Sequence, residues 1–420
     1  FGATHHLSDA LGGPGSLPVE ADSPGEGGYF KYVGTSKPIE DLHYIGDDVE
    51  VVILDTAPDP QVEDWAAHKK EWQDHRLVKF LLTDKKLDIK RSDEMYNWQP
   101  ENWQLLKDYK HHDNSYKMPD HGLFIAGIIH TIAPNAKLHL YEVLNQYGVG
   151  SLDSIVRGLT KAFEQIEQRR KLIINCSFML HTSVVDDFCE LKHIDEGFHP
   201  KLSNPCILTH MNTALETIIK NTLESGLIVV AAAGNDAKYM DFDGQDVEAH
   251  LFNTGQRPRQ ARPSARYPAA FENVIGVGAV PQEAPSGPGL TLGGSGVKEH
   301  RPAYYSNLSD VPPKTGIVTL GGEAEKGKGV LGVYIHEFPV EDGVNAQEKY
   351  HYVDNKTGWA WWAGTSFAAA IISGILAKAV GSRAAWDAKS ALDLLRGGGL
   401  DMVKDETKDA NEKVILVEQT

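Results

Sequence analysis

Residues 51–59 read VVILDTAPD, and this stretch decides the fold class. Its first four residues form a continuous apolar run, mostly β-branched, that ends at Asp55. Such a run is typical of a strand inside a parallel sheet that helices cover on both faces. Further runs of this kind lie at residues 172–177, 226–233 and 273–280, and residues 137–143 alternate like a strand.

Helical patterns separate these strands. They cover residues 121–130, 151–170, 211–225 and 366–380. The alternation predicts an α/β fold with a mainly parallel central sheet, and right-handed crossovers place helices on both faces. Ligand sites in such sheets lie outside the carboxyl ends of the strands. Asp55 and Asn235 both follow a predicted strand, so we expect them at that edge.

The charge of the chain excludes some classes of partner. Its 420 residues include 41 Lys and Arg against 58 Asp and Glu, a formal net charge of −17. Nucleic acids and anionic membrane surfaces are bound by basic faces, so neither is an expected partner. No apolar run is long enough to cross a bilayer as a helix.

The chain has three cysteines, Cys176, Cys189 and Cys206. An odd number cannot pair completely within one chain, and no CxxC spacing indicates a zinc site. Three mostly buried thiols are therefore favoured over one disulfide. Unpaired thiols are compatible with a reducing intracellular compartment.

Four local patterns hold residues that could carry chemistry. They are Asp55 after its strand, His121 in DHG, Asn235 in AAAGN and Ser366 in GTS. Taken singly, each has an ordinary structural interpretation as a turn, a polar helix start or a helix N-cap. Together they supply an acid, a general base, an amide donor and a nucleophile, which acyl transfer by serine requires. The order Asp, His, Ser along the chain is that of subtilisin.

On these residues the sequence resembles the subtilisin-like serine proteases. The motifs VVILDTAPD, HGLFIAGII, VVAAAGN and AGTSFAA carry the resemblance, together with IAPNAKLHLYEV and ARYPAAFENVIGVGAV between them. Over half of the chain is covered, in the family's order. The resemblance implies a serine endopeptidase with a catalytic triad and an oxyanion hole.

The resemblance assigns roles residue by residue. Ser366 would be the nucleophile, His121 the general base and Asp55 the acid that orients the His121 ring. Asn235 would donate its amide to the oxyanion. In the family an extended peptide substrate pairs as an added strand with two backbone segments. The substrate-binding residues would be Gly148, Val149 and Gly150, Ser177, Phe178 and Met179, with Ala231, Ala232, Ala233 and Gly234 lining the primary specificity pocket.

Three positions depart from the family pattern. Phe124 replaces a second histidine of the His motif, and Ala370 replaces a proline after the nucleophile. Met179 and Leu180 stand where glycines are usual, so their side chains would narrow the cleft and restrict the specificity. The same change motivates an alternative, a pseudoprotease or binding module on the same fold.

Length alone suggests about three domains, but the span of the motifs favours one enlarged domain. We expect an N-terminal arm at 1–45, a peptidase domain at 46–396 and a C-terminal tail at 397–420. Surface insertions are expected at about 60–118, 181–207 and 238–262. Tryptophans at helical spacing in the first insertion, such as Trp65 and Trp72, are packing residues or an exosite for a partner.

No organic cofactor and no metal site are expected. The segment 241–246 resembles a calcium loop only weakly, and a solvated acidic loop is the better interpretation. A protein or peptide substrate is the expected partner, and an inhibitory pro-segment would be usual in the family. The resemblance favours export from the cell, whereas the thiols allow an intracellular location.

Overall fold

The computed structural model describes a core of the chain and several shorter pieces. The described residues are 4–6, 17–24, 32–34, 48–92, 116–164, 171–179, 216–217, 219–220, 227–235, 265–271, 274–281, 299–300, 302–309, 316–323, 327–342, 350–381, 390, 393, 395, 401–403, 413–414 and 417–419. The insertions expected at 181–207 and 238–262 lie outside them, as do Leu180, Cys189 and Cys206.

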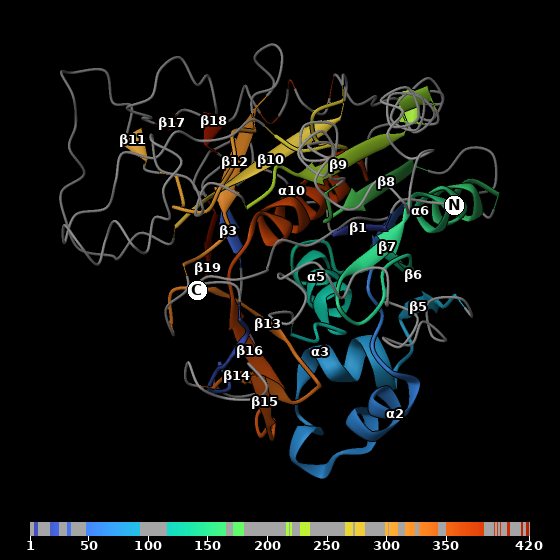
Figure 1. The fold of residues 1–420 in the computed structure, drawn as a ribbon, viewed down its shortest axis with the longest axis vertical. Coiled ribbons are helices and arrows are strands. Elements are labelled where there is room, and N and C mark those ends of the chain that lie inside the picture. The colour runs from blue at the N-terminus through green and yellow to red at the C-terminus, as the bar shows by residue number, and fades with distance from the viewer. Residues whose placement is uncertain are drawn as a thin grey trace, which may run out of the picture.

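A ten-stranded sheet organises the described residues (Figure 1), in the order β11-β17-β18-β12-β10-β9-β8-β4-β6-β5. The strands are β4 (Val49–Asp55), β5 (Leu87–Lys90), β6 (Lys137–Glu142), β8 (Lys171–Cys176), β9 (Ile228–Ala232), β10 (Ile275–Val280), β11 (Glu299–His300), β12 (Ile317–Leu320), β17 (Asp401–Val403) and β18 (Lys413–Val414). Seven neighbours, from β12 to β5, run parallel. The predicted α/β class with a mainly parallel sheet is confirmed.

Helices cover both faces of this sheet. Val51 and Ile53 of β4 face one hydrophobic core, which also holds the apolar residues of α5 (His121–Ile132) and α10 (Thr365–Val380). Val52 and Leu54 face a second core with α6 (Leu152–Glu164). All seven residues of β4 are buried, which explains the continuous apolar run. Burying each such side chain contributes roughly 1.5–3 kcal/mol, so the cores hold the strand ends in place.

A smaller set of strands lies beside α5 and was not predicted from the sequence. β13 (Val330–Val333), β16 (Trp359–Trp362) and β2 (Val19–Glu20) form an antiparallel sheet. β14 (Phe338–Glu341) and β15 (Tyr350–Val353) form a hairpin. Figure 1 shows these strands together below α5.

The first insertion was predicted to lie on the surface, but part of it is buried. Its described part forms α2 (Pro60–His68), a 3-10 turn (Lys70–Trp72), α3 (Arg76–Val78), a π turn (Lys79–Thr83) and the edge strand β5. Trp72, Leu77 and Leu81 are buried in the same core as α5, so this segment extends the core. The prediction overlooked that apolar residues between charged ones can all fall on the covered side of short helices.

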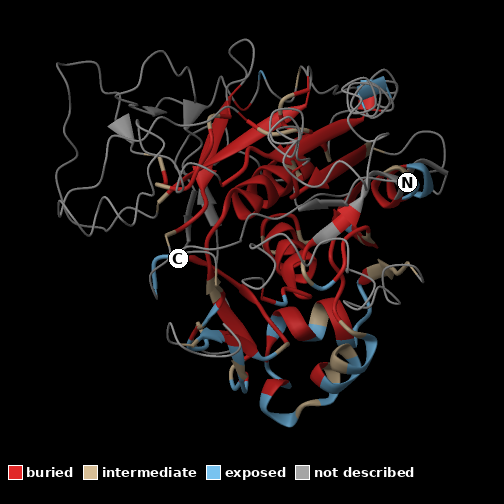
Figure 2. Cartoon of the chain, viewed as in Figure 1, coloured by how far each residue is buried: buried red, intermediate tan, exposed pale blue. Residues whose placement is uncertain are grey.

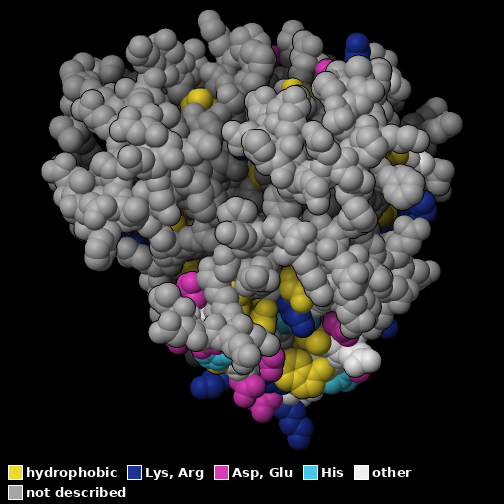
Figure 3. Space-filling view, in the orientation of Figure 1, with side chains coloured by type: hydrophobic (Ala, Val, Ile, Leu, Met, Phe, Trp, Pro, Cys, Tyr) yellow, Lys and Arg dark blue, Asp and Glu magenta, His cyan; other side chains and the backbone are white. Residues whose placement is uncertain are grey.

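Figure 2 shows the buried residues concentrated in the sheet, α5 and α10, with exposed residues around α2 and β14–β15. On that rim Trp65 is 48% exposed and packs edge-on against the buried Trp72, while Val340 and Val353 are also exposed. Figure 3 shows hydrophobic side chains there among acidic and basic ones. The packing interpretation of the tryptophans therefore holds for Trp72.

The described pieces of the arm expected at 1–45 include paired strands. β1 (Thr4–His6) pairs with β7 (Val149–Ser151), and β3 (Tyr32–Gly34) pairs with β19 (Val417–Gln419). Cys176 is a buried free thiol whose pKa is raised by burial. No helix in the described part of the chain has the length and apolarity to span a membrane.

Candidate active site

Asp55 and His121 form a buried pair at the carboxyl end of the central strand. Asp55 is the last residue of β4, which lies between β6 and β8, and His121 is the first residue of α5. Asp55 Oδ1 lies 2.7 Å from His121 Nδ1 and accepts the Thr56 N–H at 2.7 Å. The Asp55 side chain is fully buried and that of His121 is 1% exposed. The structure thus brings together two residues that are 66 positions apart in the sequence.

Aromatic side chains hold the His121 ring from the other side. Its centroid lies 5.4 Å from the ring of Trp362 and 5.5 Å from that of Phe367. Phe124 packs against both of these rings and fills the space beside Gly332, where the phenyl carbons would touch any added Cβ. The departure from the family pattern at Phe124 is therefore part of an aromatic cluster behind the imidazole.

Ser366 is the second residue of α10 and is 6% exposed. Its hydroxyl donates to the carbonyl oxygen of Ser177 at 3.3 Å, and the Ser177 hydroxyl donates to the Ser366 carbonyl at 3.1 Å. Among the described residues no hydrogen bond joins Ser366 to His121, although the next residue, Phe367, touches the His121 ring. Ser366 and His121 are thus close to one another, but the Ser366 hydroxyl points to the Ser177 carbonyl after β8 and not to the imidazole.

Asn235 lies beside the start of α10. Its Oδ1 accepts both the N–H and the hydroxyl of Thr365, each at 3.0 Å. Because Oδ1 is turned to Thr365, the amide nitrogen is directed to the other side, toward Gly364. Gly234 before it has φ of +112°, and an added Cβ there would lie 2.7 Å from Asn307 Nδ2. Only glycine suits this close turn.

The predicted substrate-binding residues lie at the start of β7, after the end of β8 and at the end of β9. Gly148 to Gly150 enter β7, an edge strand that already pairs antiparallel with β1, with His5 opposite Gly150. Ser177, Phe178 and Met179 follow β8 and are all buried, and Ala232 ends β9. The Met179 side chain is packed within the fold.

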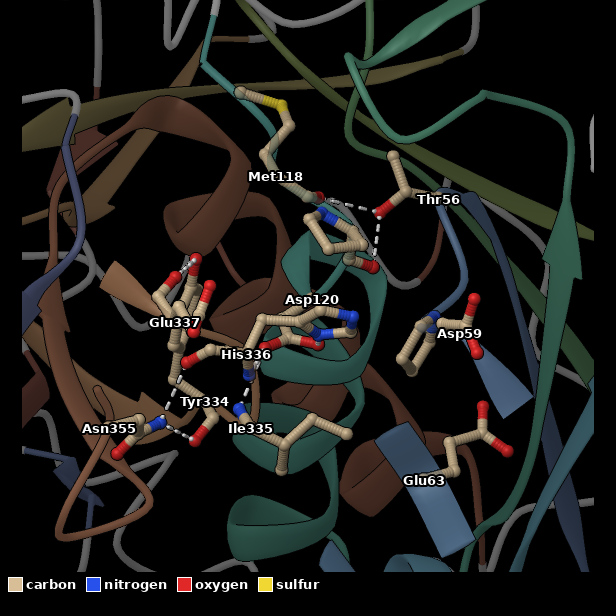
Figure 4. Close-up of polar contacts among 12 residues, drawn as sticks. Thr56, Asp59, Glu63, Met118, Asp120, Tyr334, Ile335, His336, Glu337 and Asn355 are labelled. Carbon is tan, nitrogen blue, oxygen red and sulfur yellow. Dashed lines mark hydrogen bonds and ion pairs between the residues drawn. The ribbon is translucent and has the colours of Figure 1, made fainter. Parts of the chain in front are cut away.

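Sequence reasoning missed a second set of contacts around the start of α5 (Figure 4). The Thr56 hydroxyl lies 3.1 Å from the Met118 carbonyl and 3.0 Å from that of Pro119. Asp120 accepts hydrogen bonds from the backbone N–H groups of Ile335 and His336, each at 2.7 Å, and lies 2.7 Å from His336 Nδ1. Asp120 stood in the DHG motif, but nothing in the sequence indicated His336, which is 216 positions away.

Two glutamates influenced by Arg91 have raised pKa values. Burial raises the pKa of Glu63 to about 7, although Arg91, which binds its carboxylate, opposes the shift. Burial also raises the pKa of Glu142 to about 7. Within the described ranges, no group of three or more His, Cys, Asp or Glu residues could hold a metal ion.

A buried Asp–His pair at the end of a strand in a parallel sheet, close to a serine at a helix start, is the set of groups that serine hydrolases use. The chain belongs to the subtilase family, whose model, described as Peptidase_S8, matches residues 46–397. It is therefore a subtilisin-like serine endopeptidase, as the sequence predicted.

The solved structures that are similar to the chain include two proteases. A cold adapted subtilisin-like serine proteinase is 14% identical with a TM-score of 0.45, over 89% of this chain and 90% of that one. A lanthipeptide protease is 17% identical with a TM-score of 0.47, over 87% of this chain and 85% of that one. No curated protein matches the sequence.

Proposed function

We propose that the chain hydrolyses peptide bonds through an acyl-enzyme on Ser366, with His121 and Asp55 completing the triad. The observation that carries this proposal is the buried 2.7 Å contact between Asp55 Oδ1 and His121 Nδ1 at the end of β4. That contact places the proton of the ring on Nδ1, so Nε2 is the basic nitrogen toward substrate. Membership of the subtilase family supports the same assignment.

The reaction follows from these positions. The Ser366 hydroxyl leaves the Ser177 carbonyl, turns to His121 and attacks the scissile carbonyl carbon while Nε2 takes its proton. The carbon–nitrogen bond then breaks and His121 returns the proton to the leaving amine. Water attacks the acyl-enzyme in the same way and frees Ser366. Asp55 stabilises the imidazolium that forms in each step.

Asn235 and the start of α10 would stabilise the oxyanion. The amide nitrogen of Asn235 is held in place through the two Thr365 hydrogen bonds to its oxygen. The Ser366 N–H lies in the first turn of a 16-residue helix, where the helix dipole favours an anion. Preorganised donors of this kind stabilise the transition state without reorganisation.

Substrate would enter as an extended strand along β7. β1 pairs antiparallel with β7 in the way that such a peptide would, so β1 would have to leave this edge for substrate to bind there. A restricted specificity is proposed because Met179, which is buried beside the end of β8, stands with Leu180 where glycines are usual in the family. Rapid cleavage of casein at many sites would contradict this restriction.

A fluorophosphonate probe tests the nucleophile. We expect the wild type to take up one label, and Ser366→Ala and His121→Ala to take up almost none. Ser373→Ala is the matched control, because it removes another buried hydroxyl of α10. A folded wild type that takes no label from the probe would support the alternative, a binding module without catalysis.

A further inference from the structure

Asp120 occupies the N-cap position of α5 but does not cap the helix. An Asp at this position ordinarily accepts a hydrogen bond from the second or third N–H of its own helix. The Asp120 side chain makes no such bond. Its carboxylate is fully buried and is used elsewhere, directly beside the residue proposed as the general base.

Both carboxylate oxygens of Asp120 instead bind the turn between β13 and β14. Oδ2 accepts the N–H groups of Ile335 and His336, and Oδ1 lies 2.7 Å from His336 Nδ1. Figure 4 shows the imidazole of His336 and the backbone of Ile335 directed at the Asp120 side chain. Charge-assisted bonds of this length are roughly twice as strong as neutral ones.

The turn that binds Asp120 is itself fixed. The buried Asn355 donates from Nδ2 to the carbonyl oxygens of Tyr334 at 2.7 Å and His336 at 3.1 Å. Its Oδ1 accepts the Gly358 N–H at 2.9 Å, and Tyr334 N–H donates to the Gly358 carbonyl. The contacts therefore run without a gap from Asn355 through the turn and Asp120 to His121.

The opposite side of the same helix start is held by Thr56. Its hydroxyl oxygen accepts the Gly122 N–H at 3.3 Å and lies close to the carbonyls of Met118 and Pro119. Thr56 follows Asp55, so it ties the helix to the strand that carries the acid. Thr56 thus holds one side of the first turn of α5 to β4, and the Asp120 contacts hold the other side.

We propose that Asp120 and His336 are positioning residues, a second carboxylate–imidazole pair that sets the His121 ring against Asp55. This inference rests on the proposed function, in which His121 is the general base. The pair touches no reacting atom. It acts by holding the first turn of α5 and by balancing the charge next to His121.

The charges around His336 support a protonated imidazole. Burial by itself lowers the pKa of His336, but the charge and hydrogen bond of Asp120 outweigh it and raise that pKa above its usual value. Asp59 and Glu63 of the α2 segment add to the increase, and Arg91 binds Glu63. A protonated His336 cancels the charge of Asp120, so the pair is close to neutral beside His121.

The two partners should consequently differ in their electrostatic effects. His336→Gln leaves the Asp120 carboxylate uncompensated, which favours a protonated His121 and moves the acid limb of the kcat/KM profile to higher pH. Asp120→Asn removes the charge that raises the pKa of His336, so the buried His336 becomes neutral as well and the limb should stay close to that of the wild type. At this proximity we expect the shift in His336→Gln to be about half a pH unit or more.

The experiment measures kcat and KM over pH with a chromogenic peptide substrate. For Asp120→Asn and His336→Gln we expect kcat to fall about ten- to a hundred-fold, because small displacements of a catalytic group are costly, with KM within about twofold. His351→Gln is the matched control. His351 makes the same 2.7 Å contact with Asp342, but on the exposed β14–β15 hairpin, and its loss should leave rates and limb unchanged.

Equal loss of kcat in both variants without the upward shift in His336→Gln would overturn the proposal, since a purely structural role predicts no such shift. Thermal unfolding shows which variants are folded, and if Asp120→Asn fails, the upward shift in His336→Gln decides. A second readout needs no turnover, the NMR signal of the Nδ1 proton of His121 in protein with ¹⁵N-labelled histidine. If the wild type is inactive but the signal changes in Asp120→Asn and His336→Gln, the proposed function is refuted and the inference stands. An unchanged signal in an active enzyme would refute the inference alone.

Discussion

At the scale of single residues, Asn235 illustrates how a side chain is oriented by a neighbour. An asparagine amide has an acceptor and a donor end. Thr365 binds the acceptor end twice, at the start of the helix that carries Ser366. In the proposed mechanism, the donor end would face the carbonyl oxygen of a substrate bound to Ser366.

This orientation leads to a prediction for Asn235. Replacing it by Ala should lower kcat by about two to three orders of magnitude with little change in KM, because the donor acts mainly in the transition state. Asn235→Asp is the informative companion, because it keeps the shape and the bonds from Thr365 but removes the donor. Steady-state kinetics on both variants check this, and full activity of Asn235→Asp would show that no donor is needed there.

At the scale of elements, the start of α5 can approach β4 only because Gly122 follows His121. An added Cβ at Gly122 would lie 2.3 Å from the Thr56 carbonyl oxygen, which belongs to the backbone and cannot turn away. Gly127 of the same helix is less constrained. There the Cβ would meet the Val333 side chain at 3.0 Å. The first turn is therefore tighter than the middle of the helix.

We expect Gly122→Ala to lower the free energy of unfolding by about 1–3 kcal/mol and to reduce kcat, because the overlap must push α5 away from Asp55. Gly127→Ala should cost less, since a side chain can adjust. Urea unfolding and kinetics on the two variants test the order. A larger stability loss for Gly127→Ala than for Gly122→Ala would contradict it.

The elements also differ in how well their sequence predicts them. β4, β8, β9 and α10 are buried on all sides, so nearly every residue is apolar and the pattern is plain. β13 to β16 are strands of only four residues each, and β16 pairs both with β13 and with the distant β2 near the start of the chain. Their stability comes from packing against α5 and from cross-strand pairs, which no local pattern reports.

At the scale of the whole molecule, two buried histidines oppose two partly buried glutamates in the response to acid. Burial lowers the pKa of His75 and of His130 to about 4, and it raises the pKa of Glu63 and of Glu142 to about 7. Between pH 6.5 and 4 these histidines are protonated in the unfolded chain but remain neutral in the folded protein. Acid therefore destabilises the fold in this range. The glutamates bind protons in the folded state first, which has the opposite sign.

Replacing one histidine should reveal its part of this balance. His130 stacks on Phe80 and its Nδ1 is buried without a hydrogen-bond partner among the described residues. Relative to wild type, His130→Phe should gain about 3 kcal/mol in the free energy of unfolding as the pH falls from 6.5 to 4. Denaturant titrations along this range, with the exposed His68→Gln as control, measure the difference. A constant difference between His130→Phe and wild type over this range would contradict the buried neutral imidazole.

The sequence by itself determined the α/β class, the elements around Asp55, His121, Asn235 and Ser366, and the family. It could do so because strands buried on both faces are apolar throughout and because the motifs are local. Only the tertiary structure decided that the first insertion enters the core, that Ser366 faces Ser177, and that Asp120 binds His336. These contacts join segments distant in the chain, and the free energy of such contacts depends on packing and burial that arise only when the sheet and its helices come together.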